Sequence, residues 1–210
     1  YTNGQISKTT NDWVNSSIIV QNNGTGVDEE GAWVTPYLMH PTDHKTLIVG
    51  KSQVHQSSDG GLTWNQTANI PGITGMIKSM AYAPSNPLYI YVATEKTLYR
   101  TTDGGGSWTK MVTSPTTITY IAVDPINPDR VWYTLSEYIS GSKVKYYDGT
   151  AWADFSGTLP NIPVNCIVYE NNSNDALYIG TDRGVYYRNS AMTDWVAFSN
   201  NLRNVVVNEL

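Results

Sequence analysis

Three glutamates are the side chains in this sequence that could perform acid–base chemistry. Glu29 and Glu30 lie in the acidic segment Asn22–Ala32, and Glu137 lies in the segment Ser136–Ser142. Glycoside hydrolysis needs two carboxyl groups, one as acid and one as base or nucleophile, at a set separation. Neighbouring acids in a sequence usually point apart, so a solvated acidic loop is the alternative. We expect no catalytic residue; if the chain is an enzyme, these three glutamates are the candidates and the class is glycoside hydrolase.

Aromatic and charged residues near these glutamates are candidates for ligand binding. Trp33 and Tyr37 follow the acidic segment, Tyr138 follows directly after a glutamate, and Asp182 and Arg183 are adjacent. A Tyr or Trp ring offers a large apolar face together with a polar group, which suits contact with a sugar or with another protein. The alternatives are strand packing for the aromatic residues and a surface ion pair for Asp182 and Arg183.

The sequence predicts neither a metal site nor a cofactor. His40, His44 and His55 do not form a recognisable ligand cluster. The acidic segment has the ligand chemistry of a calcium site without a recognisable loop spacing. The glycine runs do not precede helices, so a phosphate-binding loop is absent. The single cysteine, Cys166, cannot form an internal disulfide and is expected to be buried in a strand.

The composition excludes several classes of partner. The 210 residues are 40% apolar and 15% charged, with a net charge of −5 and no basic block. A nucleic-acid partner is therefore not expected. No apolar run approaches the roughly 20 residues of a membrane-spanning helix, so membrane insertion is not expected either. The abundance of Asn, Thr, Ser and Tyr favours an extracellular or cell-surface location.

Recurring tryptophans indicate how the candidate residues are positioned. Trp13, Trp64, Trp108, Trp152 and Trp195 follow one another at intervals of 51, 44, 44 and 43 residues. A period of about 40–45 residues with four strands in each unit is typical of β-propeller blades.

Each repeat contains four expected strands, named A to D in chain order. Strand A runs into a turn rich in Pro and Asn, strand B is a continuous apolar run, and strand D begins at the tryptophan. The expected A strands lie in Pro36–Asp43, Ser79–Pro87, Tyr120–Pro128 and Cys166–Asp175. In a propeller the D–A and B–C loops share one face, and the candidate residues above fall on these loops.

The predicted fold is an all-β β-propeller segment of about four four-stranded blades, with partial blades at both ends and almost no helix. We expect the segment to be part of a larger protein. The expected parts are strands C and D of a partial blade over 1–20, blades over 32–70, 76–113, 118–157 and 164–199, and the first strand of a further blade over 204–210.

Two octads, Ser57–Trp64 (SSDGGLTW) and Thr101–Trp108 (TTDGGGSW), occupy the turns between strands C and D. Asp and Gly favour tight turns, because Asp bonds the following backbone and Gly adopts positive φ. Later repeats lose the motif, which favours a structural role. The structural residues are Ser57, Asp59, Gly61, Trp64, Thr101, Asp103, Gly105 and Trp108.

These octads resemble the Asp-box, or bacterial neuraminidase repeat. The family includes sialidases, xyloglucan-degrading glycoside hydrolases, sortilin-type receptors, photosystem assembly factors and secreted bacterial proteins. The resemblance implies that Asp59 and Asp103 stabilise turns far from the ligand face. Asp124–Pro128 and Gly184–Arg188 look like blades of the xyloglucan-degrading family and of large bacterial surface proteins, but that family's catalytic aspartate contexts are not found.

The resulting functional expectation is a non-catalytic propeller module of an exported or cell-surface protein. Its D–A and B–C loop face would bind a protein or a glycan, and the remaining blades of the parent protein would be further partners. The alternatives are one lobe of a polysaccharide-active glycoside hydrolase and a purely structural propeller domain.

Overall fold

The computed structural model describes residues 4–21, 26–198 and 204–210, so parts of the predicted 1–20 and 164–199 segments and of the acidic loop lie outside the described residues. Within the described ranges the chain forms β-strands and loops without an α-helix, which confirms the all-β prediction. In the same ranges no helix is long and apolar enough to cross a membrane.

The chain divides into two compact units, which are described separately. The first comprises Tyr1–Tyr82 and Pro87–Val112, and the second comprises Ala83–Asn86 and Thr113–Leu210.

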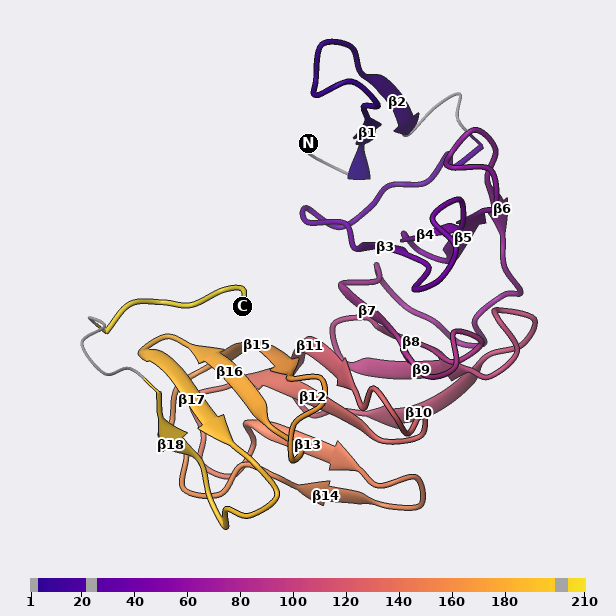
Figure 1. The fold of residues 1–210 in the computed structure, drawn as a ribbon. Helices are drawn as coiled ribbons and strands as arrows, with labels where there is room; N and C mark the ends of the chain where they lie inside the picture. Colours follow the sequence, from indigo (N-terminus) through magenta and orange to yellow (C-terminus); the bar gives the residue numbers. More distant parts are fainter. Residues whose placement is uncertain (1–3, 22–25, 199–203) are drawn as a thin grey trace. The chain divides into compact units, whose positions relative to one another are not determined.

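The first unit contains one two-stranded sheet and two four-stranded sheets (Figure 1). The two-stranded sheet pairs β1 (Ile6–Lys8) with β2 (Ser17–Val20). The next sheet has the order β3 (Tyr37–Met39), β4 (Leu47–Gly50), β5 (Val54–Ser57) and β6 (Asn65–Gln66). The following sheet has the order β7 (Ser79–Tyr82), β8 (Ile90–Ala93), β9 (Thr97–Thr101) and β10 (Thr109–Thr113).

The second unit contains two four-stranded sheets with the same sequential order. One consists of β11 (Thr117–Val123), β12 (Val131–Ser136), β13 (Val144–Tyr147) and β14 (Trp152–Asp154). The other consists of β15 (Val164–Tyr169), β16 (Leu177–Thr181), β17 (Gly184–Arg188) and β18 (Val196–Ala197). The strands of these two sheets pair antiparallel. The D–A and B–C connections therefore lie at one end of the strands, and the A–B and C–D connections lie at the other end.

The strand in position B of each four-stranded sheet is largely buried. All four residues of β8 are buried, as are five of the six residues of β12. Continuous apolar sequence fits strands that are covered on both faces. In the first unit Ile48, Met80 and Val92 join one cluster. In the second unit Trp132 stacks on Tyr146 with ring centroids 4.8 Å apart.

Three buried tryptophans each join their own sheet to the preceding sheet of the same unit. The indole Nε1 of Trp64 donates to the Ile19 carbonyl at 2.8 Å, and Nε1 of Trp195 donates to the Phe155 carbonyl at 2.8 Å. Nε1 of Trp108 donates in the same way to the Thr67 hydroxyl at 3.3 Å. Each ring therefore buries its apolar faces and satisfies its one polar group.

Trp13 does not have this role, which corrects the prediction that a strand begins there. It is 65% exposed and has a φ of 66°, and the strand begins four residues later, at Ser17. Its backbone amide donates to the Thr9 hydroxyl at 3.0 Å, so the residue belongs to the turn of the β1–β2 hairpin.

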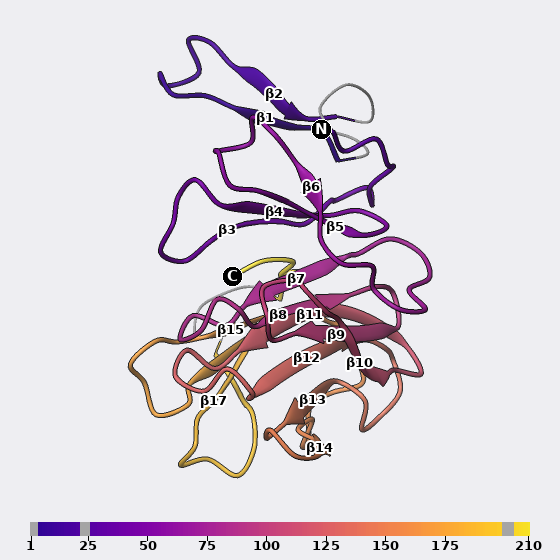
Figure 2. The same cartoon turned by 90° about the vertical axis from the view of Figure 1, so that its right-hand side faces the viewer.

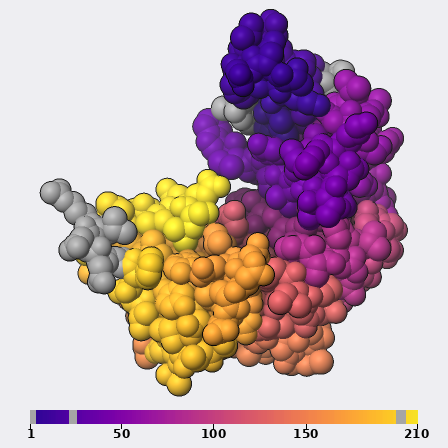
Figure 3. Space-filling view, viewed as in Figure 1, coloured from indigo at the N-terminus to yellow at the C-terminus, as the bar shows by residue number. Residues whose placement is uncertain are grey.

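Residues 204–210, predicted as the first strand of a further blade, form no ladder with the described strands, so this strand stays a prediction. The segment is tied to the ends of two strands instead: Val207 donates its amide to the Thr181 carbonyl at 2.9 Å, and Gly184 donates to the Val205 carbonyl at 2.9 Å. Figure 3 shows the segment in yellow against the orange surface of the last sheet.

Candidate functional site

The second unit brings together two of the predicted ligand residues on its B–C loops. The Tyr138 hydroxyl donates to Asp182 Oδ2 at 3.1 Å, although the two residues are 44 positions apart in the chain. The Asp182 carboxylate also accepts from Asn165 Nδ2 at 3.1 Å. The hydrogen bond to Asp182 raises the pKa of the Tyr138 hydroxyl, so the phenol stays protonated and keeps donating.

The Tyr138 ring is 67% exposed, and its neighbour Ile139 is 64% exposed. The arrangement thus combines an open aromatic face, a carboxylate and an amide. A hydrogen bond fixes the ring, which reduces the rotamer freedom that would be lost on binding. Such a surface can stack on an apolar face and accept hydrogen bonds from hydroxyl groups.

The loop that carries Tyr138 is held by a buried lysine that the sequence reading did not identify. Lys143 is fully buried, and its ammonium group donates to the carbonyl of Glu137. Burial lowers the pKa of Lys143, because a low-polarity environment disfavours the charged form. Only its position between a loop and an apolar strand could have signalled this role.

The other two predicted residues on these loops have different surroundings. Glu137 accepts a hydrogen bond from the backbone amide of Tyr138 at 2.8 Å, which is a local turn contact. Arg183 is exposed and donates its backbone amide to the Thr181 hydroxyl at 3.1 Å.

In the first unit, Glu29 is part of a polar cluster with the B–C loop and strand β5. Its carboxylate accepts from the Ser52 backbone amide at 3.1 Å and from the Ser52 hydroxyl, and lies 3.3 Å from His55 Nε2. Burial alone would raise the pKa of Glu29, but the Ser52 hydrogen bonds and the His55 ring outweigh it and lower the pKa. Glu29 is therefore held ionised by neighbours, which does not suit a proton donor.

The backbone around Glu29 is fixed by a second buried lysine. Lys51 is fully buried and donates through Nζ to the Glu29 carbonyl at 2.9 Å. The adjacent Glu30 is exposed. Of the two predicted glutamates, Glu29 therefore makes structural contacts and Glu30 faces the solvent.

Trp33 and Tyr37 are 74% and 59% exposed. Both line a groove of 410 Å³ in the first unit together with Gly4, Gln5, Ile6, Val34 and Thr35. No group of three or more His, Cys, Asp or Glu side chains in the described residues is arranged to hold a metal ion.

The two Asp-Gly turns use their aspartates to close the turn itself. Asp59 Oδ1 accepts from the Ser57 hydroxyl at 2.8 Å and from the backbone amide of Thr63 at 2.9 Å, and Oδ2 accepts from the Thr63 hydroxyl at 2.7 Å. Asp103 repeats these contacts with Thr101 and Ser107. Hydrogen bonds from Ser107 and Thr101 lower the pKa of Asp103 to about 2.

This geometry predicts a pH-dependent contribution of Asp103 to stability. The pKa of Asp103 is depressed on folding, so its contribution is complete above the unfolded value of about 3.9 and is lost as the pH falls towards about 2. Asp103→Asn should lower the urea midpoint at pH 7, and the difference from the parent should shrink towards pH 2. The exposed Asp12→Asn is the control for removing a surface carboxylate, and its urea midpoint at pH 7 should stay close to the parent.

No protein-family model matches the sequence. No curated protein is significantly similar to it either. Solved structures are similar in fold. An ancestral GH74 enzyme aligns with a TM-score of 0.67 and 20% identity over 81% of this chain and 24% of its own. The GH74 xyloglucanase from Xanthomonas campestris aligns with a TM-score of 0.64 and 14% identity over 81% of this chain and 33% of its own.

The chain has the fold of a β-propeller segment. A further similar structure, YCF48 bound to D1 peptide, aligns with a TM-score of 0.55 and 13% identity over 80% of this chain and 58% of its own. The β-propeller segment therefore spans between 24% and 58% of the chains that it resembles. At these identities the likeness concerns the fold alone.

Proposed function

We propose that the chain is a non-catalytic module of an exported or cell-surface protein, that it belongs with the Asp-box propellers, and that it binds a ligand through its D–A and B–C loops. The observation that supports this function is the group formed by Tyr138, Asp182 and Asn165. A protein or a glycan could contact this group, and its chemistry favours a glycan. The exposed ring would stack on the apolar face of a sugar, while the carboxylate and the amide would bond adjacent hydroxyl groups.

A calorimetric titration of the chain with a panel of oligosaccharides tests this function. Tyr138→Ala and Asp182→Asn should each weaken binding at least tenfold, which corresponds to about 1.4 kcal/mol. Asp182→Asn keeps the size of the side chain but removes its charge and one acceptor.

Ile126→Ala is the control, because Ile126 is an apolar residue of the same unit that is 79% exposed in the turn between β11 and β12, at the opposite strand ends from the D–A and B–C loops. It should leave the affinity unchanged. Equal loss of affinity in all three variants would contradict a specific site at Tyr138. Absence of binding to every sugar would leave the glycan ligand unsupported.

One lobe of a glycoside hydrolase is the second candidate, because two of the similar structures are GH74 enzymes. This alternative requires that Glu30→Gln or Glu137→Gln abolishes hydrolysis of a β-glucan without changing the melting temperature. The local contacts of Glu29 and Glu137 favour the binding function instead.

A further inference from the structure

The Tyr138 group of the second unit contains a carboxylate whose negative charge is not balanced. The Tyr138 loop connects β12 with β13 and the Asp182 loop connects β16 with β17, so two adjacent sheets contribute to the group (Figure 1 and Figure 2). Asp182 accepts one neutral hydrogen bond on each oxygen, from Tyr138 and from Asn165, both at 3.1 Å. The ion pairs within residues 4–21, 26–198 and 204–210 involve other carboxylates, so Asp182 has no cationic partner in these ranges.

The Asp182 carboxylate can accept further hydrogen bonds. An ionised carboxylate has about four acceptor positions, and the two bonds above use two of them. Asp182 is half-buried, so a ligand can reach it from the solvent. An ammonium group at this position would add a charge-assisted hydrogen bond, which is roughly twice as strong as a neutral one.

The two cationic side chains of these loops do not neutralise Asp182. Lys143 is fully buried, and its ammonium group donates to the Glu137 carbonyl. Arg183 is exposed, its backbone amide donates to the Thr181 hydroxyl at 3.1 Å, and its guanidinium group forms no ion pair with Asp182. The negative charge is therefore available to a ligand.

An amine suits this group better than a metal ion does. In the part of the chain that the structure describes, no three His, Cys, Asp or Glu side chains are placed to hold a metal. The Tyr138 ring is 67% exposed, and its hydroxyl touches the carboxylate. An ammonium group within about 6 Å of an aromatic face is attracted to that face. The ring and the carboxylate together match a flat sugar ring that carries an ammonium group.

Building on the glycan-binding function above, we propose that this site selects amino sugars with an unacetylated ammonium group, such as oligosaccharides of glucosamine. The sugar ring stacks on Tyr138, and the ammonium group donates to the Asp182 carboxylate. Asp182 is then the residue that determines specificity. An N-acetylated sugar presents the same ring without the charge, and a uronic acid places a second negative charge against Asp182, which is repelled.

A calorimetric titration of the full chain with the glucosamine trimer and with the N-acetylglucosamine trimer tests the proposal. At about pH 6 an amine and a carboxylate are ordinarily both charged. We expect the glucosamine trimer to bind about tenfold more tightly, the effect of one charge-assisted hydrogen bond. Added salt should reduce the difference, because it screens exposed charges. Asp182→Asn should bring the two affinities together, whereas Tyr138→Ala should weaken both.

Glu170→Gln is the matched control. Glu170 is an exposed carboxylate of the same unit that also accepts a tyrosine hydroxyl, from Tyr178 at 3.2 Å. It lies in the turn between β15 and β16, at the opposite strand ends from the site. This variant removes the same charge from the chain and should keep the preference for the glucosamine trimer. A circular-dichroism spectrum and melting temperature equal to the parent establish that each variant is folded.

The possible failures separate this inference from the proposed function. Equal affinities for the two trimers, or a preference that Asp182→Asn retains, would overturn the selection of amino sugars and leave glycan binding in place. A trilysine peptide that binds as tightly as the glucosamine trimer would also overturn it, because charge without a sugar ring would then account for the affinity. Absence of binding by these trimers and by every neutral sugar would overturn both.

Discussion

Arg130→Met is expected to lower the free energy of unfolding of the second unit by about 3–5 kcal/mol, the range for removing one partner of a buried ion pair. Arg130 Nη1 lies 2.7 Å from Asp124 Oδ2, and the Asp124 side chain is only 3% exposed. Methionine preserves much of the apolar stem but leaves this carboxylate without its cation. Urea denaturation measures the effect.

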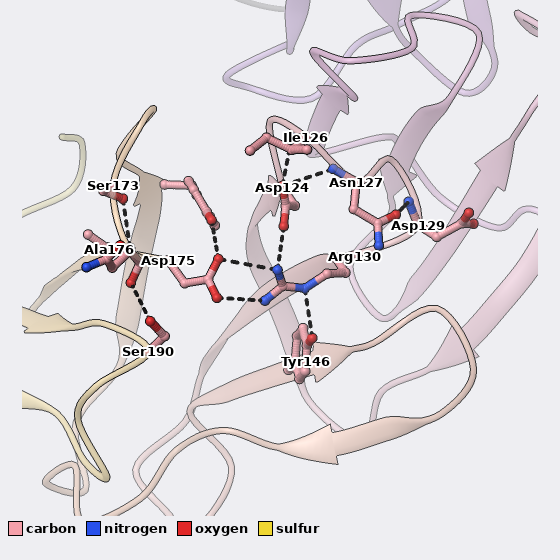
Figure 4. Close-up of polar contacts among 12 residues, drawn as sticks. Asp124, Ile126, Asn127, Asp129, Arg130, Tyr146, Ser173, Asp175, Ala176 and Ser190 are labelled. Atoms are coloured by element: carbon pink, nitrogen blue, oxygen red, sulfur yellow. Dashed lines mark hydrogen bonds and ion pairs between the residues drawn. The ribbon is translucent and has the colours of Figure 1, made fainter.

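Arg130 also connects two sheets, as Figure 4 shows. Its guanidinium group reaches Asp175 at 3.3 Å and Nε donates to the Tyr146 hydroxyl at 2.9 Å. The guanidinium carbon lies 5.2 Å from the centroid of the Trp132 ring, within the range of a cation–π contact. The single residue thus supports the Asp124 turn and its junction with the Asp175 turn.

Lys145→Met is the matched control. Lys145 forms an ion pair with Asp154 at 3.2 Å, in which the Asp154 side chain is 47% exposed. Exposed ion pairs contribute about 0–1 kcal/mol, so this variant should unfold close to the parent. A similar loss of unfolding free energy in both variants would contradict the special role of Arg130.

The ion pair between Arg130 and Asp175 should also weaken in acid. Burial alone would raise the pKa of Asp175, but hydrogen bonds from Tyr169 and Arg130 outweigh it and lower the pKa. The contribution of Asp175 is therefore present above the ordinary aspartate pKa and is lost as the pH falls below it.

Trp64→Ala is expected to destabilise the first unit by about 3–5 kcal/mol, because it removes a buried ring from the junction between β2 and the next sheet. The ring is 7% exposed, packs with Ile19 and Val49, and uses its only polar group on the Ile19 carbonyl. Trp64→Phe should cost less, since it retains much of the apolar volume and loses the hydrogen bond. Thermal or urea unfolding measures both variants.

Trp33→Ala is the control for Trp64, because Trp33 is in the same unit and 74% exposed. Its effect on stability should remain within about 0.5 kcal/mol. If Trp33→Ala destabilised the unit as much as Trp64→Ala, the burial of the recurring tryptophan would not explain how the sheets are held together.

The strands were predictable because local patterns define them. Apolar runs such as Ile90–Ala93 become buried strands, and the Asp-Gly pairs at Asp59 and Asp103 become turns that bond their own backbone. The prediction for Trp13 was wrong because its residue type and approximate spacing fit the repeat. The short hairpin around Asn11 places it in a turn instead.

Single residues of the candidate site could be predicted from the sequence, but the contacts between them could not. Tyr138 and Asp182 were candidates from their loops, but their hydrogen bond depends on how two sheets pack laterally, which no local pattern encodes. Glu29 was a candidate acid for its residue type, and its neighbours Ser52 and His55 come from a different part of the repeat. Tertiary contacts, and not sequence spacing, assign these roles.

The most direct test of the proposed binding function is an amide NMR titration of the chain with the oligosaccharide panel, with product analysis of the same samples. We expect saturable shifts centred on Tyr138, Asn165 and Asp182, with every sugar recovered intact. Shifts that are absent or centred elsewhere, or cleavage of a sugar that Glu137→Gln abolishes, would contradict it.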